Sequence, residues 1–262
     1  MKNIKIAHFV SLILIAAALT SCYGIFCVDG NGKAVTEERI VTEFSGIANE
    51  TSAIVNFETG DEISIFVEAD ENLMEYISTS VSAGMLEIEV KGATCIKPEK
   101  QVIIYITAPS INALYSSGSG DMFADVVSGS RVDIVSSGSG DIMIDYAETD
   151  DLDIRLSGSG DINIELIDSD DTYIKLTGSG DISSGGETNM LDLNSTGAGE
   201  ILCGDLETGI ADILITGSGN VHISVLNELF AVLTGSGNLY YYGDPIVSQT
   251  NTGSGNLIHR NK

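Results

Sequence analysis

Acidic and amide side chains recur at a nearly fixed spacing in this sequence, and they are its clearest candidates for chemistry. They close a short phrase, Gly-Ser-Gly in every copy but one, whose first copy begins at Gly118 and whose last begins at Gly253. The closing residues are Asp121, Asp141, Asp161, Asp181, Glu200, Asn220, Asn238 and Asn256. Such oxygen ligands could bind calcium, as in repeats of the form G-G-x-G-x-D. A structural role fits this spacing better, with each side chain accepting a backbone N–H of its own corner.

Two pairs of adjacent aspartates form a second candidate cation site. Asp150 and Asp151 precede Asp170 and Asp171 by the length of one repeat. Stacked repeats would bring the pairs side by side, and carboxylate oxygens at that density suit calcium. The alternative is a solvated acidic stripe that keeps the molecule soluble. Calcium is the single cofactor that the sequence suggests.

Tyr240, Tyr241 and Tyr242 form the aromatic cluster of the repeats. The alternation predicts that Tyr241 points inward and that the other two point outward. Exposed rings could stack on a sugar, although tyrosine is also common in strands for packing reasons.

Catalysis has little support in the sequence. His222 is expected to point outward, without an acid or nucleophile partner. The separation of Arg131 and Arg155 is longer than one repeat, so we expect no aligned cluster of charged residues on one face. The many serines lie in glycine corners and form no arrangement typical of a nucleophile. We therefore expect a protein that is not an enzyme.

Stacked strands would have to position these residues. Apolar and polar residues alternate in Leu152–Leu156 and Ile162–Leu166, which is typical of half-buried strands. A phrase that returns about every 20 residues indicates a solenoid, whose repeats bury their apolar faces against their neighbours. Each repeat is expected to hold a strand, a glycine corner, a second strand and a variable return loop. Glycine would serve the corner by adopting positive φ and by allowing close backbone approach.

The predicted fold class is all-β: a single-stranded parallel β-helix with coils of about 18–20 residues. Strands about 4.8 Å apart would give a rod on the order of 35–40 Å long. Right-handed coils are expected, because parallel crossovers nearly always have that hand. An antiparallel sandwich is the main alternative. A left-handed hexapeptide helix would show a six-residue sub-period, which this sequence lacks.

Residues 1–21 are predicted to be a signal peptide, with Lys2 and Lys5 before a short apolar run. The run ends in Leu19-Thr20-Ser21-Cys22, which resembles the lipobox of bacterial lipoproteins. That resemblance implies cleavage before Cys22 and lipidation of Cys22; ordinary signal cleavage is the alternative. A lipid anchor would hold the protein at the outer membrane of the cell envelope without spanning it. Whether it faces the periplasm or the outside stays open.

The remaining chain divides into three parts. Residues 22–36 are expected to be the lipidated N-terminus and a tether, and residues 37–110 a β head that begins and caps the solenoid. Residues 111–262 hold the glycine repeats, continuous with the head. Polar residues at inward positions near the end of the sequence, Gln249 and Asn251, fit a second, weaker cap.

Charge and cysteine usage limit the partners. With 38 acidic and 12 basic residues the net charge is −26. Such a surface repels nucleic acid and anionic lipid, so contact with a membrane is expected through the anchor alone. Cys203 falls in an apolar column and is expected to be a buried free thiol. Cys27 and Cys95 could pair in an oxidising envelope compartment, and the sequence leaves this open.

Several stretches of the chain resemble the family described as putative auto-transporter adhesin, head GIN domain. They are Glu43–Ile47, Val67–Leu73, Val81–Ile88, Ala108–Asn112 and the glycine phrases, and together they cover about residues 38–258. The family consists mostly of secreted or lipid-anchored proteins of bacterial envelopes, so the resemblance implies that location and a β-helical fold. It supplies no catalytic residues and no ligand.

The predicted function is that of a non-catalytic, lipid-anchored envelope protein: an adhesin or an interaction scaffold for an envelope protein or a glycan. One alternative is a β-helix that binds or cleaves polysaccharide. Another is a structural module stabilised by calcium. Fold alone does not separate them, since β-helices serve both enzymes and binding proteins.

Overall fold

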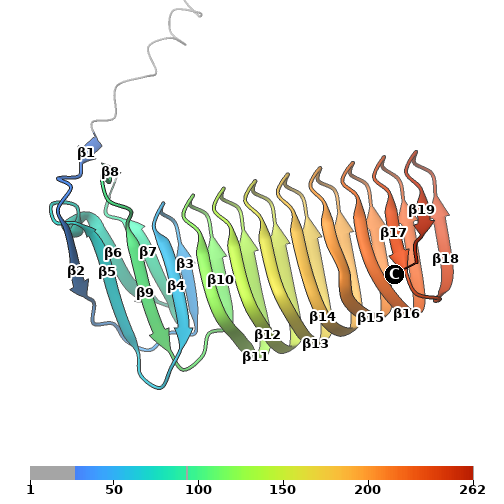
Figure 1. Cartoon of the computed structure of the whole chain (residues 1–262), viewed down its shortest axis with the longest axis horizontal. Helices are drawn as coiled ribbons and strands as arrows, with labels where there is room; N and C mark the ends of the chain where they lie inside the picture. The colour runs from blue at the N-terminus through green and yellow to red at the C-terminus, as the bar shows by residue number, and fades with distance from the viewer. Residues whose placement is uncertain (1–26, 93, 262) are drawn as a thin grey trace, which may run out of the picture.

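The computed structural model describes residues 27–92 and 94–261 of the 262-residue chain. All but two strands in this part of the chain join one 17-stranded sheet, which winds into a rod (Figure 1). The elements are β1 Cys27–Asp29, β2 Ala34–Glu38, β3 Gly46–Asn49, β4 Ile54–Thr59, β5 Ser64–Asp70, the 3-10 helix η1 Met74–Tyr76, β6 Ile77–Ser82, β7 Met85–Val90, β8 Cys95–Lys97, β9 Ile103–Ala108, β10 Ala113–Ser116, β11 Met122–Ser136, β12 Ile142–Leu156, β13 Ile162–Leu176, β14 Ile182–Ser195, β15 Ile201–Ile215, β16 Val221–Leu233, β17 Leu239–Tyr242, β18 Ile246–Asn251 and β19 Leu257–His259.

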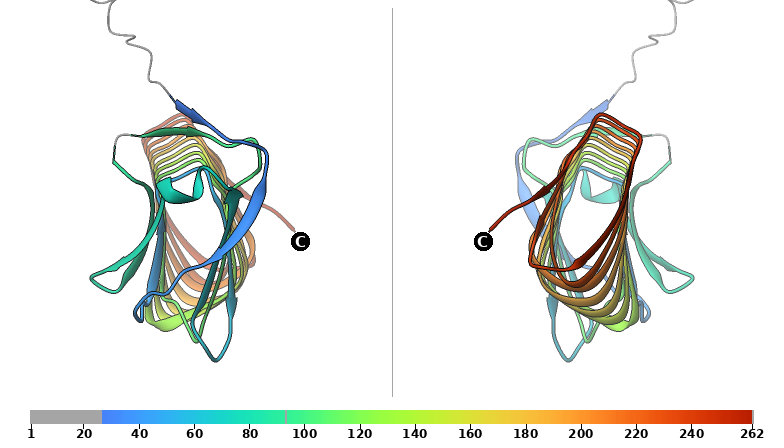
Figure 2. Two further views of the ribbon diagram at one scale, coloured as in Figure 1. Left: turned by 90° about the vertical axis from the view of Figure 1, so that its left-hand side faces the viewer. Right: turned by 90° about the vertical axis from the view of Figure 1, so that its right-hand side faces the viewer.

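The strands β11 to β16 form the body of the rod, one coil each. Every strand pairs in parallel with the next, so Ile134 lies beside Ile154 and Ile154 beside Ile174. One repeat along the sequence therefore becomes one step between neighbouring strands. The end-on views in Figure 2 show the coils superposed around a common interior. The parallel β-helix is confirmed, and the antiparallel sandwich is wrong for the repeats.

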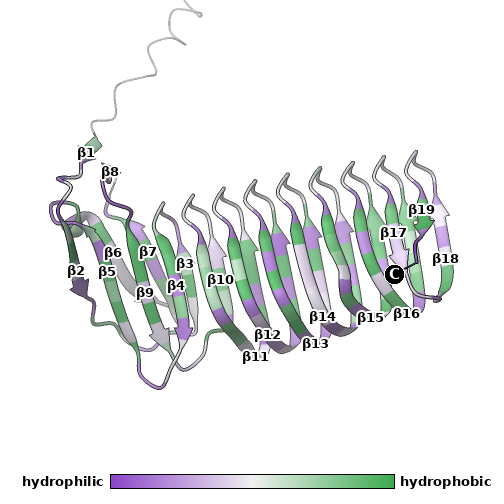
Figure 3. Cartoon of the chain, viewed as in Figure 1, coloured by the Kyte–Doolittle hydropathy of each residue, from purple (hydrophilic) through white to green (hydrophobic). Residues whose placement is uncertain are grey.

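Apolar side chains fill that interior in continuous columns. Figure 3 shows hydrophobic and hydrophilic residues alternating along the strands. One column contains Leu114, Ile134, Ile154, Ile174, Leu193, Ile213 and Ala231, and a second contains Met122, Ile142, Ile162, Ile182, Ile201, Val221 and Leu239, each at most 2% exposed. Stacking buries both faces of each side chain in a column, which no single repeat could do alone.

The expected return loops are replaced by strand. β12 runs without a break through Asp150 and Asp151, between the buried segments of its coil. The strand bends there, with Ala147 and Leu152 buried and Asp150 exposed. An equivalent bend in the coils on either side keeps the hydrogen-bond ladder intact through the turn. A loop is therefore unnecessary wherever neighbouring coils have nearly the same length.

The glycine corners require glycine for one of the two predicted reasons. The prediction that the corner glycines adopt positive φ is wrong. The described glycines with positive φ, such as Gly32 and Gly84, lie outside the corner phrases. Close approach is confirmed. A Cβ on Gly158 would lie inside contact distance of the Gly138 carbonyl oxygen, and the same clash occurs at each corner glycine. Backbone stacked directly on backbone leaves no room for a side chain.

The head is a more complex layer of strands that the chain visits out of order. β7 and β9 pair in parallel with β3 and β4, so they form a coil before the one that β3 and β4 make. The chain then crosses back, and β10 pairs with β3 on one side and with β11 on the other. Antiparallel pairs β2–β5, β5–β9 and β6–β7 cover this end of the rod. The strands at this end of the rod are therefore antiparallel, unlike those of the coils.

Part of the segment expected to be a tether is folded into the head. Of residues 22–36, those from Cys27 onward include β1 and the beginning of β2, which pairs antiparallel with β5. A disulfide between Cys27 and Cys95 joins β1 to β8, so the pairing that the sequence left open is present. The predicted signal peptide and Cys22 lie outside the described residues.

An asparagine supports the corner at each end of the stack. Asn49 accepts the Thr51 N–H at 3.1 Å and donates to the Ala53 carbonyl at 2.9 Å. Asn251 does the same for Gly253 and Gly255, at 3.0 and 2.7 Å. Each of these amides thus joins the two sides of its own corner. The weak cap expected near the end of the sequence includes this contact, while β18 is exposed along its whole length.

Candidate functional site

The ladder of corner residues links one coil to the next. The backbone N–H of Asp161 donates to Asp141 Oδ1 at 2.8 Å, and that of Asp181 donates to Asp161 Oδ1 at 2.8 Å. The expectation that each side chain bonds its own corner is wrong, because the acceptor belongs to the preceding coil. Each carboxylate thus meets an N–H donor, which offsets the repulsion between stacked carboxylates. The repeat spacing in the sequence does not indicate which coil supplies the N–H donor.

Amides continue the ladder after the single glutamate. Asn220 Nδ2 donates to Glu200 Oε1 at 3.1 Å, and the Asn238 N–H donates to Asn220 Oδ1 at 3.1 Å. Asn256 repeats this contact with Asn238 at 3.0 Å. Because an amide oxygen makes the same bond as a carboxylate oxygen, the ladder is a structural feature whose charge is optional.

The two aspartate pairs lie in register on neighbouring coils. Asp151 pairs with Asp171, and Asp150 and Asp170 line an open hollow of about 560 Å³ on the outer side of the bend. Asn189 Nδ2 donates to Asp170 Oδ1 at 2.8 Å. Within the described ranges, no three His, Cys, Asp or Glu side chains converge on a point where a metal ion could bind. The geometry therefore gives the calcium hypothesis no support.

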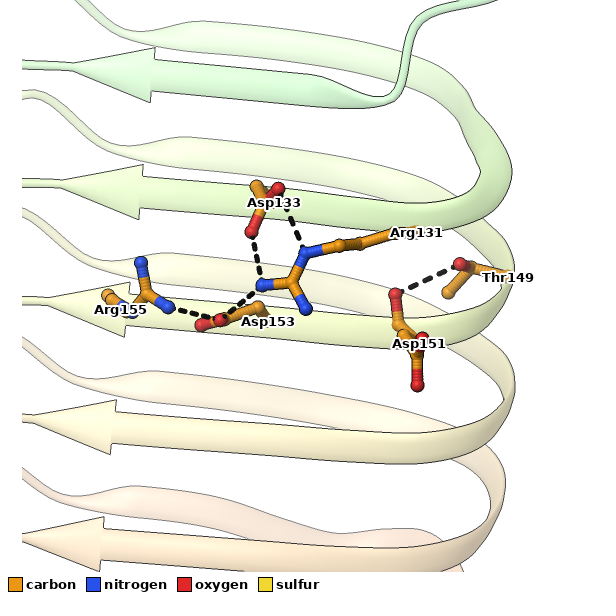
Figure 4. A network of polar contacts seen from close by, with 6 residues as sticks. All are labelled: Arg131, Asp133, Thr149, Asp151, Asp153 and Arg155. Carbon is orange, nitrogen blue, oxygen red and sulfur yellow. Dashed lines mark hydrogen bonds and ion pairs between the residues drawn. The ribbon is translucent and has the colours of Figure 1, made fainter.

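Two arginines converge on one aspartate in the middle of the rod (Figure 4). Arg131 binds Asp133 at 2.8 Å and Asp153 at 2.7 Å, and Arg155 also pairs with Asp153. The expectation that the arginines do not align is wrong. Asp133 and Asp153 are in register, and the long Arg131 side chain reaches diagonally from its own coil to the next. Asp133 and Asp153 hold the pKa of Arg131 above its ordinary value, chiefly through the hydrogen bond to Asp133.

This cluster joins two coils through ion pairs. The Asp153 side chain is 8% exposed, so its two cationic partners compensate a carboxylate that is largely removed from water. The neighbouring Thr149 hydroxyl donates to the Asp151 main-chain carbonyl at 3.0 Å, a contact that braces the bend. The cluster is best explained as an ion-pair brace between coils.

The histidines in the described part of the chain contact tyrosine rings. His222 stacks on Tyr240 with ring centroids 4.5 Å apart, and His259 stacks on Tyr241 with centroids 5.0 Å apart. Tyr241 packs against the core, as its position in the alternation predicts. Burial lowers the pKa of His222; Glu200 partly opposes this shift, and nearby Arg260 adds to it. Cys203, a free thiol, is fully buried with its pKa raised to about 11 by burial, so it is not a reactive nucleophile.

A hollow near these rings was not predicted from the sequence. The spacing between glycine phrases becomes shorter after Gly217, and the spacing alone gave no site. In the structure, this shortening leaves a hollow of about 380 Å³ lined by Leu202, Gly204, Asp205, His222, Tyr242 and Asn261. A change in coil length within a regular stack is the signal that could have located it.

The part of the chain that the structure describes has no helix long and apolar enough to cross a bilayer. Its stacked parallel coils and corner ladder define the protein as a β-solenoid. Within that class, the chain belongs to the family described as putative auto-transporter adhesin, head GIN domain, whose model matches residues 43–165 and 144–245. The resemblance noted in the sequence is confirmed.

Solved structures share this fold. A putative lipid binding protein from Parabacteroides distasonis ATCC 8503 is 28% identical, with a TM-score of 0.83, over 90% of this chain and 100% of that one. A putative adhesin from Parabacteroides merdae ATCC 43184 is 23% identical, with a TM-score of 0.81, over 89% and 98%. A second P. distasonis protein, also described as a putative adhesin, is 22% identical, with a TM-score of 0.83, over 90% and 100%. No curated protein matched the chain.

Proposed function

We propose that this protein is a non-catalytic, lipid-anchored component of the bacterial cell envelope that presents its rod as a contact surface, in the manner of an adhesin. The observation that carries the proposal is the shape of the molecule. β1 lies at the head, and the coil of β18 and β19 lies at the opposite end of the rod (Figure 1). An anchor at Cys22 would therefore hold the head near the membrane and project the repeats away from it.

The family description and the adhesin names of two related structures support a role in contact. Three features of the rod agree with a role that is not enzymatic. Its interior columns are filled by side chains, its ionic cluster is a brace, and the described histidines contact tyrosine rings. The acidic surface disfavours anionic partners, so a neutral or basic surface component is the expected contact.

The anchor is tested by growing bacteria that express the full chain with an alkyne-labelled fatty acid. Wild type should take up the label and fractionate with membranes, whereas Cys22→Ser should lose the label. Cys27→Ser is the matched control, since it removes a cysteine of the disulfide but should leave labelling intact. Label that persists in Cys22→Ser would overturn the anchor, and reproducible cleavage of polysaccharide by the purified chain would overturn the non-catalytic role.

A further inference from the structure

The change in coil length creates a step in the wall of the rod. Cys203 on β15 pairs with Ile223 on β16, but the next pair is Glu207 with Ser224. The register between the two strands therefore passes over Gly204–Leu206 of β15. Here the wider coil extends past the narrower one, so this part of the surface departs from the regular stack.

Tyr242 reaches across this step from the coil beyond. It is paired with Ser224 on β16, and its ring extends back toward β15. A Cβ placed on Gly204 would lie 3.1 Å from Tyr242 Cε2, which is tighter than ordinary contact. Glycine at position 204 therefore leaves room for the aromatic ring, which stays partly exposed at the edge of the hollow.

Tyr240 and Tyr242 were both predicted to point outward, but their surroundings differ. Other side chains of the protein already cover the ring of Tyr240. The ring of Tyr240 stacks on His222, and the Arg260 guanidinium lies 5.2 Å from its centroid. A sugar could stack on the ring of Tyr240 only if it displaced His222 or Arg260. Tyr242 is the aromatic residue that lines the hollow.

The rest of the lining supplies planar polar groups next to apolar surface. Leu202 is 41% exposed and offers an aliphatic surface. His222 has a lowered pKa, so at neutral pH its imidazole is uncharged, with one nitrogen that donates and one that accepts. Asn261 adds an amide, and Asp205 adds a carboxylate. The volume, about 380 Å³, falls within the roughly 300–1,000 Å³ typical of small-molecule sites.

From this arrangement we infer that the hollow at the coil step binds a neutral sugar unit of a glycan. A sugar ring has an apolar C–H face that can pack on Tyr242 and Leu202, and hydroxyls that can bond to planar side chains such as Asn261. An anionic sugar fits poorly, because Asp205 lines the hollow and the chain carries a net charge of −26. The inference rests on the proposed contact function and names the class of molecule contacted.

The test uses the full chain, purified in a detergent that has no sugar headgroup. Saturation-transfer difference NMR is recorded with the methyl glycosides of glucose, galactose, mannose and N-acetylglucosamine, and with glucuronic acid as the anionic comparison. Wild type should bind at least one neutral glycoside and not glucuronic acid. Tyr242→Ala should weaken that binding by about fivefold to tenfold, the size expected for loss of an aromatic contact. Tyr242→Phe should retain it.

Tyr105→Ala is the matched control, because it removes another partly exposed tyrosine from β9 in the head, away from the step. It should bind like wild type, and thermal melts should show that all variants are folded. Absence of binding to every neutral glycoside, or equal binding by wild type and folded Tyr242→Ala, would overturn the inference. Either result would leave the proposed function standing if Cys22-dependent anchoring is observed, so the two failures are distinguishable.

Discussion

At the scale of single residues, the corner glycines should tolerate substitution poorly. Gly158→Ala should reduce the free energy of unfolding by about 2–3 kcal/mol, because the new methyl group collides with the Gly138 carbonyl and the stacked coils must shift apart. Ser159→Ala, at the exposed central position of the same phrase, should change it by less than about 0.5 kcal/mol. Urea denaturation of the two variants checks the contrast. Equal stabilities would show that the corner can relax.

The corner ladder should depend on its acceptor and not on its charge. Asp181 Oδ1 accepts the Glu200 N–H at 2.7 Å. Asp181→Ala leaves that N–H without its partner and should cost about 1 kcal/mol, whereas Asp181→Asn keeps an acceptor oxygen and should cost less. Urea denaturation at neutral pH provides the comparison. A larger loss in Asp181→Asn than in Asp181→Ala would contradict the role assigned to the ladder.

Cys203 should make stability fall at alkaline pH. Burial raises the pKa of its thiol from 9.0 to about 11, so the unfolded chain loses this proton at a lower pH than the native one. The stability that this difference provides is fully present below pH 9 and is lost as pH rises toward 11. Subtracting the pH profile of Cys203→Ala from that of wild type isolates the effect from other groups. A flat difference across this alkaline range would show that the native thiol titrates normally.

At the scale of elements, the disulfide fixes the first strand to the head. It joins cysteines that are 68 residues apart, on β1 and β8, and those two strands pair only with each other. Cys95→Ser should remove about 2–5 kcal/mol of stability from this end. Hydrogen exchange should then be faster in β1 and β8 and unchanged in β12 to β15, because the coils are stabilised by their own neighbours. Uniformly faster exchange would mean that head and rod unfold as one unit.

The elements of the rod could be predicted from sequence because each repeat carries the same information in the same place. The columns around Ile154 and Ile162 follow from alternation and a fixed spacing, and both are fully buried. The continuous bends were missed because an exposed Asp150–Asp151 pair in a strand looks like a loop when its neighbours are not considered. The order of strands in the head was missed for a related reason. The pairing of β10 with β3 joins residues far apart in the sequence, such as Leu114 and Ile47, and no local pattern specifies it.

The candidate sites were predictable only in part. Spacing placed Asp151 beside Asp171, but it did not show that too few carboxylates converge to bind a metal within the described ranges. Arg131 and Asp153 were missed because a long side chain contacts a residue diagonal to it, so a spacing of one repeat is not required. The hollow at Tyr242 arises from an irregularity in coil length, and its lining comes from β15, β16, β17 and the segment after β19.

At the scale of the whole molecule, repulsion between negative charges should destabilise the folded state, and any added salt should weaken that repulsion. The chain carries a net charge of −26, and acidic residues stack coil upon coil, as Asp192 does on Asp212. Burial and the neighbouring Asp212 raise the pKa of Asp192, so it favours folding at low pH and loses that contribution as pH rises through its native value. Added salt screens the remaining repulsion, with a Debye length of about 10 Å at roughly 0.1 M. The melting temperature should therefore rise as sodium chloride is added.

Calcium should act on the rod as a general divalent salt, since no described cluster offers three carboxylates to one ion. At matched ionic strength, calcium and magnesium chloride should raise the melting temperature equally, and the double variant Asp150→Asn/Asp170→Asn should respond as wild type does. Differential scanning calorimetry over micromolar to millimolar concentrations distinguishes the cases. A rise that saturates at low calcium, exceeds that with magnesium and disappears in the double variant would establish a specific site at the bend. It would also make the rod a calcium-stabilised module.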